Sequence, residues 1–422
     1  MLTRIPALAY PAHHPAARAR RVTHDPRPGS RIAHSHTHPY FRAMPTVAAA
    51  VIPRPGAAIE LREFTVPELE RDSALLAVEA SEVCGTDVHL RAGRLAGVPY
   101  PLIPGHVAAG TIERLRGSLR DVEGNPIREG DRVTFLDVHG TCNACWYCLV
   151  AKATTRCPER RVYGITYGAD AGLAGGWAES VYLRPGTRCI PLGDADSATF
   201  IAGGCSLPTA LHAVERAGIA IGETVLVLGS GPVGLSAIIL ARMSGALRVL
   251  CIGAPAHRLD AARTVGASET LSIESSSPEE RIEWVRERTG GRGADVTIEA
   301  AGAPAAVAQA MRCTRDAGRV VVVGQYTDHG DASFNPHLDL NRRHLDVRGC
   351  WGSDYSHFHR AVQIVRDPER SRPWRSLPLS RFGLEDAQRA VDLVAEGRVV
   401  KAIIEPRLNG HRQPHFSSFI PD

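Results

Sequence analysis

The sequence lacks several features that would place the protein outside the ordinary globular class. No stretch approaches 18 uninterrupted apolar residues, so no transmembrane helix is predicted, and no apolar signal-peptide core precedes the cysteines. Lysine occurs only twice, at Lys152 and Lys401, which leaves arginine as 47 of the 49 basic residues, a bias that we attribute to genome composition. Hydrophobic residues make up 44% and charged residues 22%, a balance that indicates a folded chain.

The net positive charge of the chain comes from one end of it. Residues 1–44 hold seven arginines and one acid, Asp25, a balance of +6 against +4 for the whole chain, so the other 378 residues carry −2. Without a basic excess in its body, the chain is not expected to bind nucleic acid. Residues 1–43 also lack a periodic apolar pattern, which predicts a disordered tail or a mis-assigned start with Met44 as the true beginning. An Arg-rich targeting peptide is the alternative.

The 422 residues predict two or three domains, and the pattern changes twice along the chain. Short apolar runs broken by Gly, Pro and Asp predict a β-rich domain over 44–195, and the same style returns over 343–422. Between them, over 196–342, continuous apolar strands alternate with helical segments, the first of them a helix expected over 202–218. This alternation predicts an α/β, doubly wound parallel sheet that is inserted into the β-rich domain.

A glycine-rich turn separates the predicted strand 224–228 from the next helix. Gly229 allows a tight turn, Gly231 lets the backbone approach a pyrophosphate, and Gly234 lets helix and strand pack closely. In this strand–helix context the G-x-G-x-x-G motif predicts dinucleotide binding at the helix N-terminus. The motif residues assigned to the cofactor are Gly229, Gly231, Pro232, Val233 and Gly234.

The choice between NAD and NADP stays open at the next strand. An acid that binds the ribose is expected there, but the strand ends at Ile252 and Gly253 without Asp or Glu. Gly253 leaves room for a 2′-phosphate, and Arg258 is placed either to reach that phosphate or to face the adenine of NAD. The missing carboxylate removes the repulsion that excludes NADP, but it does not create a phosphate site.

Four of the ten cysteines fall within sixteen residues, as Cys142, Cys145, Cys148 and Cys157. In a long chain without an export signal, such clustering favours a metal over disulfides and a reducing, cytoplasmic location. Four thiolates can close a tetrahedral zinc site, which would make that zinc structural. The spacing alone leaves an iron–sulfur cluster or a chance run of cysteines open.

A second set of possible ligands is dispersed. Cys84 follows a predicted strand, His106 lies in a Gly-His loop, and Cys205 lies at the junction with the α/β domain. Two thiolates and one imidazole would leave zinc one open position, which is the catalytic form. Taken singly, Cys205 also fits a small buried hydrophobe and His106 an ordinary loop histidine.

Together these motifs resemble the medium-chain zinc-dependent alcohol dehydrogenases, from about Met44 to about Arg407. The matching segments are Cys84-Gly-Thr-Asp-Val-His89, Pro104-Gly-His106-Val-Ala-Ala-Gly110, Gly130-Asp-Arg-Val133, the four-cysteine run, Gly175-Gly-Trp-Ala-Glu179, the Gly229 turn and Gly397-Arg-Val-Val-Lys401. The resemblance implies a GroES-like catalytic domain over 44–195 and 343–422, with a structural zinc lobe at 140–160. It also implies a Rossmann domain over 196–342.

The resemblance assigns a role to each site residue. Catalytic zinc ligands are Cys84, His106 and Cys205, and structural zinc ligands are Cys142, Cys145, Cys148 and Cys157. Thr86 and His89 match a proton relay, and Asp87 matches an acid that is expected to orient the imidazole ligand His106. Thr209, four residues past Cys205, is expected to contact the nicotinamide. Two zinc ions and NAD or NADP are the implied cofactors, a small alcohol or carbonyl compound is the substrate, and a homodimer or homotetramer is the implied assembly.

The implied activity is reversible oxidation of an alcohol, secondary or polyol-like, to an aldehyde or ketone by hydride transfer. Two alternatives remain: a zinc-free quinone or enoyl reductase of the same broad fold, and a non-catalytic, zinc-stabilised NAD(P) sensor. One departure from the family bears on the choice. The family usually has Glu directly after the zinc histidine, and some polyol dehydrogenases use it as a ligand, whereas this chain has Val107. We therefore expect a Cys-His-Cys-water site.

Overall fold

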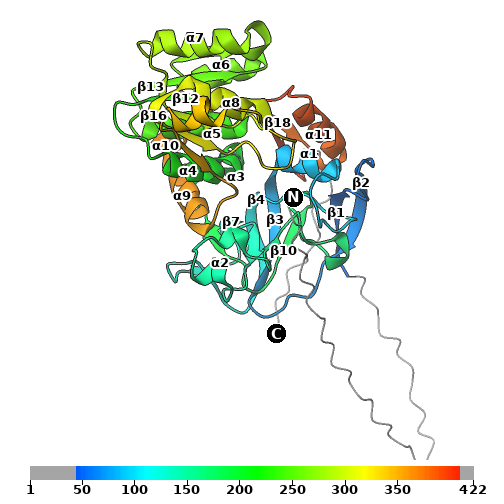
Figure 1. Cartoon of the computed structure of the whole chain (residues 1–422). Coiled ribbons are helices and arrows are strands. Elements are labelled where there is room, and N and C mark those ends of the chain that lie inside the picture. Colours follow the sequence, from blue (N-terminus) through cyan, green and yellow to red (C-terminus); the bar gives the residue numbers. More distant parts are fainter. Residues whose placement is uncertain (1–43, 409–422) are drawn as a thin grey trace, which may run out of the picture. The chain divides into compact units, whose positions relative to one another are not determined.

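The computed structural model describes residues 44–408; the tail predicted over 1–43 lies outside the described residues. Six parallel strands form the central sheet of the α/β part, in the order β14-β13-β12-β15-β16-β17. Figure 1 shows β12, β13 and β16 of this sheet among the surrounding helices. Their bounds are β12 Thr224–Leu228, β13 Arg248–Gly253, β14 Glu269–Ser272, β15 Ala294–Glu299, β16 Thr314–Val322 and β17 Asp346–Gly349. The predicted doubly wound parallel sheet is confirmed.

Helices cover both faces of this sheet. They are α4 Ser206–Ala217, α5 Pro232–Met243, α6 Ala256–Thr264, α7 Pro278–Arg288 and α8 Pro304–Cys313. Val225 and Val227 of β12 share an apolar cluster with α4, α5 and α6, whereas Leu226 and Leu228 share one with α7 and α8. Because successive strand residues point to opposite, equally buried faces, the strand is apolar throughout.

A seven-stranded sheet forms the β-rich part. Its main path runs β11-β7-β4-β3-β19-β18, and β10 also pairs with β3. The bounds are β3 Ser73–Val83, β4 Ala108–Arg116, β7 Arg132–Phe135, β10 Ser180–Leu183, β11 Cys189–Pro191, β18 Leu379–Phe382 and β19 Lys401–Ile404. β19 lies antiparallel to β3 with Ile403 opposite Glu82, so segments before and after the α/β part share one sheet, and the predicted insertion is confirmed.

The remaining strands are short, and the remaining α-helices range from four to 12 residues. Three strand pairs are β1 Thr46–Val51 with β2 Glu60–Thr65, β5 Leu119–Arg120 with β6 Pro126–Ile127, and β8 Val138–Gly140 with β9 Arg161–Val162. The other helices are α1 Gly85–Arg91, α2 Trp146–Leu149, α3 Ser197–Gly203, α9 Tyr355–Arg366, α10 Pro368–Arg375 and α11 Ala387–Ala395. Within residues 44–408 no helix is long and apolar enough to cross a membrane.

Two sequence expectations need correction. The α/β part was expected to end at residue 342, yet β17 at 346–349 is the sixth strand of its sheet. β17 reads Asp-Val-Arg-Gly and is largely exposed at the edge of the sheet, so it has no apolar run to reveal it. The single helix expected over 202–218 is divided into α3 and α4, which are separated at Gly204 and Cys205.

Candidate active site and metal centres

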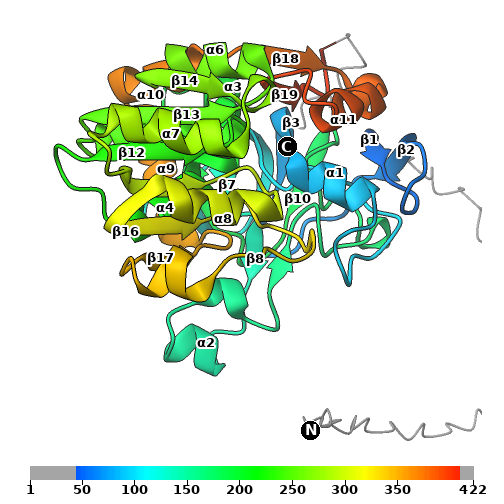
Figure 2. The same ribbon diagram turned by 45° about the horizontal axis from the view of Figure 1, so that its top comes forward.

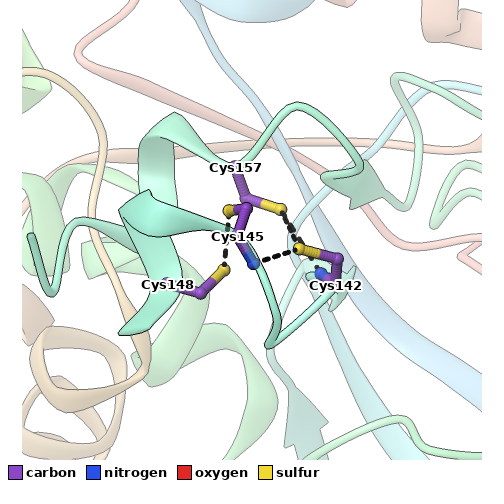
Figure 3. Close-up of side chains that lie close together, drawn as sticks. All are labelled: Cys142, Cys145, Cys148 and Cys157. Atoms are coloured by element: carbon purple, nitrogen blue, oxygen red, sulfur yellow. Dashed lines mark hydrogen bonds between the residues drawn. The ribbon is translucent and has the colours of Figure 1, made fainter. Parts of the chain in front are cut away.

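The four clustered cysteines converge in a small lobe that carries the four-residue helix α2 and projects away from both large sheets (Figure 2). Their sulfurs face one another (Figure 3) and all lie within 4.8 Å of one another. Two sulfur pairs, Cys145 with Cys148 and Cys142 with Cys157, are 3.6 Å apart. That is too long for a disulfide and close to the edge, about 3.8 Å, of a tetrahedron with 2.3 Å zinc–sulfur bonds.

Apart from the cysteines, the lobe has little apolar packing that could hold its fold together. Trp146, the first residue of the helix, and Val150, which follows it, are each 62% exposed, so the lobe has almost no apolar core of its own. Backbone N–H groups of Ala144 and Cys145 lower the pKa of the Cys142 thiol to about 7, whereas burial raises the pKa of Cys148 to about 12. Without an ion Cys148 stays protonated at neutral pH, so a bound divalent cation would be needed to hold all four sulfurs as thiolates, and the donor set fits zinc.

A second cluster joins residues that are far apart in the sequence. Cys84 directly follows β3, His106 lies in the loop before β4, and Cys205 lies in the break between α3 and α4. The structure brings these three together as expected and adds Glu82, with one donor atom of each residue within 4.8 Å of the others. Two thiols, an imidazole and a carboxylate are all zinc ligands by chemistry, so the residues present fit the ion.

Sequence reasoning missed Glu82. Its carboxylate is 1% exposed; Oε1 contacts the ammonium of Lys401, and Oε2 accepts the N–H of Cys205 at 2.6 Å. Burial is the largest single effect and lowers the pKa of Lys401, but Glu82 together with the sulfurs of Cys205 and Cys84 raises it overall. Trp177 is a core residue whose indole donates to the carbonyl of Glu82 at 2.8 Å.

Asp87 lies fully buried beside the second cluster. Oδ2 accepts the N–H of Cys84 at 2.8 Å, which fixes the turn that carries this thiol. Burial raises the pKa of Asp87, and the electrostatic effect of His106 opposes that rise. Among the described residues neither Oδ1 of Asp87 nor Nδ1 of His106 has a hydrogen-bond partner, so the hydrogen bond expected between the two side chains is not formed in this structure.

A tyrosine that sequence reasoning also missed contacts the predicted relay. The hydroxyl of Thr86 is hydrogen-bonded to Tyr326, which follows β16, and also to the Cys84 thiol. Burial raises the pKa of Tyr326 to about 12, so the phenol stays protonated at neutral pH. Its ring stacks on Trp351 with 5.8 Å between centroids, and this aromatic pair therefore lies next to the second cluster.

His89 lies half-buried one helical turn beyond Thr86. Its ring centroid is 5.4 Å from that of His329 and 6.4 Å from that of Tyr326. Burial, together with the charges of His329 and Arg94, lowers the pKa of His89. A lowered pKa leaves the imidazole neutral near pH 7, in the form that can accept a proton.

The glycine-rich turn has the geometry of a dinucleotide site. Gly229 has φ +108°, and a Cβ at Gly234 would lie 1.9 Å from the carbonyl oxygen of Gly229, so neither position accepts a side chain. Nothing lies within 4 Å of a Cβ at Gly231, which caps α5, and Pro232 and Val233 begin that helix. The turn opens onto a groove of about 760 Å³, and its free helix N-terminus fits a pyrophosphate.

Gly253 and Arg258 both line this groove. Gly253 has no room for a side chain, and Arg258 is already hydrogen-bonded. A Cβ at Gly253 would lie 2.4 Å from Oγ of Ser230, whose hydroxyl donates to the carbonyl of Ala254 at 3.0 Å. The guanidinium of Arg258 donates to the carbonyl of Val399 at 3.0 and 3.3 Å. Ser230 thus fills the space in which a ribose-binding carboxylate was sought.

Thr209 lies in α4, one turn after Cys205, and is partly buried. Its backbone N–H donates to the carbonyl of Cys205 at 3.3 Å, so the two residues share one face of the helix start. This position is compatible with the expected contact to a nicotinamide next to the second cluster.

Comparisons with known proteins agree with this site. A family model described as zinc-binding dehydrogenase matches residues 232–367, and one described as alcohol dehydrogenase GroES-like domain matches residues 70–194. The chain is 33% identical over 353 residues to 5-exo-hydroxycamphor dehydrogenase of Pseudomonas putida, an alignment that covers 83% of this chain and 96% of that protein.

Solved structures are similar over the same range. An alcohol dehydrogenase from Thermotoga maritima superposes with a TM-score of 0.81 at 30% identity, covering 85% of this chain and 99% of the other. A zinc-binding dehydrogenase from Sinorhizobium meliloti 1021, solved with NADP bound, superposes with a TM-score of 0.75 at 27% identity, covering 86% of this chain and all of the other (100%).

The four-cysteine lobe generates a stability prediction. Replacing Cys145 with Ala removes one of four thiolates, and because the lobe has little apolar core, we expect a lower Tm, aggregation and the loss of about one zinc per chain. Differential scanning calorimetry and metal analysis measure both effects. Cys313→Ala, a buried cysteine outside both clusters, is the control and should keep its zinc. A C145A variant with the wild-type Tm and zinc content would contradict the assignment.

Proposed function

This chain belongs to the medium-chain zinc-binding alcohol dehydrogenase family, and on that premise we propose that it interconverts a secondary alcohol and the corresponding ketone with NAD or NADP. The observation that carries the proposal is the convergence of Glu82, Cys84, His106 and Cys205 in one cluster, with the Thr86 hydroxyl beside the Cys84 thiol. Hydroxycamphor, after which one relative is named, carries its hydroxyl on a secondary carbon.

In the proposed reaction the chain holds the cofactors, positions the alcohol and moves its proton. When bound, the zinc at Cys84, His106 and Cys205 would lower the pKa of the alcohol, and the nicotinamide would accept the hydride. Thr86 accepts the hydroxyl proton, and His89 is the group towards which that proton moves. The neutral His89 takes it towards solvent, and Thr209 contacts the nicotinamide ring. Tyr326 and Trp351 provide an aromatic wall that excludes water.

The intact donor set argues against the two alternatives. A zinc-free reductase has no use for two thiols and an imidazole that converge from three segments. The only sign of a damaged site, and so of a sensor, is Val107 in place of the usual Glu. That sign is weakened because Glu82 supplies a carboxylate to the same cluster. A screen of alcohols and ketones with each cofactor, combined with metal analysis, separates the three functions: two zinc ions per chain with turnover support the dehydrogenase.

We also propose that the chain works in the cytoplasm as a homodimer or homotetramer on a small-molecule alcohol. All ten cysteines are free in the structure, which suits a reducing compartment. β17 ends the six-stranded sheet, and such an open edge favours pairing with a second copy.

The catalytic cluster predicts the behaviour of Cys205→Ser. The variant should lose activity and about one zinc per chain but keep its fold, because the four-cysteine site is separate. Metal analysis, circular dichroism and steady-state kinetics measure these three properties, with Cys313→Ala again as the matched control. Full activity in C205S would end this assignment.

Tyr326 generates a second kinetic prediction. In Tyr326→Phe the ring still stacks on Trp351, but Thr86 loses a hydrogen-bond partner. Because one such bond contributes about 1 kcal/mol, we expect kcat/KM to fall about 5- to 10-fold with zinc content unchanged. Trp351→Phe keeps the hydroxyl and serves as the control. An unchanged kcat/KM for several alcohols in Y326F would show that the hydroxyl has no part in the reaction.

Cofactor preference generates a third prediction. With no carboxylate at Gly253, kcat/KM for NAD and NADP should differ by less than about 100-fold, or about 2.7 kcal/mol. Gly253→Asp alone would clash with Ser230, so the double variant Ser230→Gly/Gly253→Asp is the proper test, and it should shift preference strongly to NAD. Arg258→Ala should harm NADP more than NAD if Arg258 reaches the phosphate. Exclusion of NADP by several thousand-fold in the wild type would contradict this prediction.

A further inference from the structure

Glu82 is a buried carboxylate at the catalytic cluster to which the proposed reaction gives no role. It is 1% exposed, and its carboxylate lies within 4.8 Å of the donors of Cys84, His106 and Cys205. A buried carboxylate is costly unless it is paired, and Glu82 has a partner on each oxygen. Lys401 contacts Oε1, and the N–H of Cys205 donates to Oε2 at 2.6 Å.

Glu82 lies next to Val107, the residue at which this chain lacks the family's usual Glu. The N–H of Glu82 donates to the carbonyl of Val107 at 3.0 Å, so the two residues are paired neighbours across the start of β4. Val107 is fully buried in the apolar cluster that includes Phe200 and Ile201. The family's carboxylate is therefore missing at Val107, but the neighbouring strand supplies one at Glu82, which is paired with Val107.

The backbone before Cys205 is shaped to admit this carboxylate. Gly204 has φ +47°, and a Cβ there would lie 2.3 Å from Oε2 of Glu82 and 2.5 Å from its carboxyl carbon. No residue with a side chain fits at 204 while Glu82 holds its position. The break between α3 and α4, which exposes Cys205 to the cluster, is thus built around Glu82.

The charges of the cluster balance only when all of its members are counted. Two thiolates neutralise a divalent ion, and the ammonium of Lys401 neutralises Glu82. Lys401 is 2% exposed and is one of only two lysines in a chain with 47 arginines among its 49 basic residues. Because the N–H of Cys205 already occupies Oε2, only Oε1 is left for a cation, and a single point charge suits one oxygen whereas a guanidinium fork matches two.

We propose that Glu82 takes the place of the acid missing at Val107 and is the fourth protein donor to the catalytic metal, a donor that yields its position to the alcohol. The inference rests on the proposed function. The step exchanges one oxygen donor for another without transfer of electrons, and the proton of the alcohol goes to Thr86. Lys401 and the N–H of Cys205 hold the carboxylate when it is displaced.

The test compares how strongly zinc stabilises three proteins that differ in charge. Glu82→Gln removes the carboxylate charge, so zinc affinity at this site should fall about 10- to 100-fold, and the zinc-dependent rise in Tm should shrink. Lys401→Met leaves Glu82 without its counter-charge, so zinc should stabilise this variant more than it stabilises the wild type. A purely structural ion pair would lower Tm equally with and without zinc.

Replacing zinc with cobalt gives a visible absorption spectrum that depends directly on the ligands of the ion. Without alcohol, the visible absorption of cobalt-loaded E82Q should differ from that of the wild type, and the two spectra should converge once a competitive alcohol analogue is bound. Glu79→Gln is the matched control, because Glu79 lies on the same strand but pairs with Arg132 and Ser197. If K401M does not fold, the double variant E82Q/K401M lacks both charges and should bind zinc like E82Q.

Unchanged zinc affinity and an unchanged cobalt spectrum in E82Q would overturn the inference while leaving the dehydrogenase assignment intact, provided that the wild type holds two zinc ions and oxidises alcohols. A wild type with only one zinc per chain would instead overturn the proposed function itself.

Discussion

The buried ion pair between Glu82 and Lys401 is the constraint that ties the catalytic part of the molecule together. Glu82 lies on β3, before the α/β part, and Lys401 begins β19, after it, so the pair joins two chain segments that are separated by the whole nucleotide-binding sheet. The same carboxylate accepts the N–H of Cys205, at the junction itself. Neither charge can be buried alone without a cost of several kcal/mol, so all three segments must meet for either group to be satisfied.

This arrangement places the nucleotide groove and the metal cluster close to each other, as the proposed reaction requires. The parallel sheet ends at the Gly229 turn and the N-terminus of α5, which suit a pyrophosphate. Cys205 lies at the start of α4, and α4 packs against α5 in one apolar cluster. The nucleotide groove and the metal cluster are therefore held by the same pair of helices, whereas the four-cysteine lobe lies apart and depends on its own ion.

Local patterns predicted much of this from the sequence. The glycine turn, the four-cysteine run and the doubly wound sheet each depend on residues close together in the chain, and each has the expected form. What the sequence did not reveal depends on contacts between distant segments. In the sequence Glu82 is one polar residue in a predicted strand, and only the pairing of β3 with β19 places Lys401 beside it. Tyr326 lies in a loop whose path cannot be predicted from the pattern of apolar residues. β17 was missed because an exposed edge strand carries no apolar run.

The most direct test of the account is X-ray absorption at the zinc edge on the purified protein, combined with metal analysis. With about two zinc ions per chain, one bound by four sulfurs and the other by two sulfurs with nitrogen and oxygen, the average shell should hold about three sulfurs and one lighter atom. Substitution of Glu82 by Gln should leave the sulfur count unchanged in any zinc that stays bound at both sites. A single zinc with four sulfurs would contradict the account, because it would leave Cys84, His106 and Cys205 without a metal.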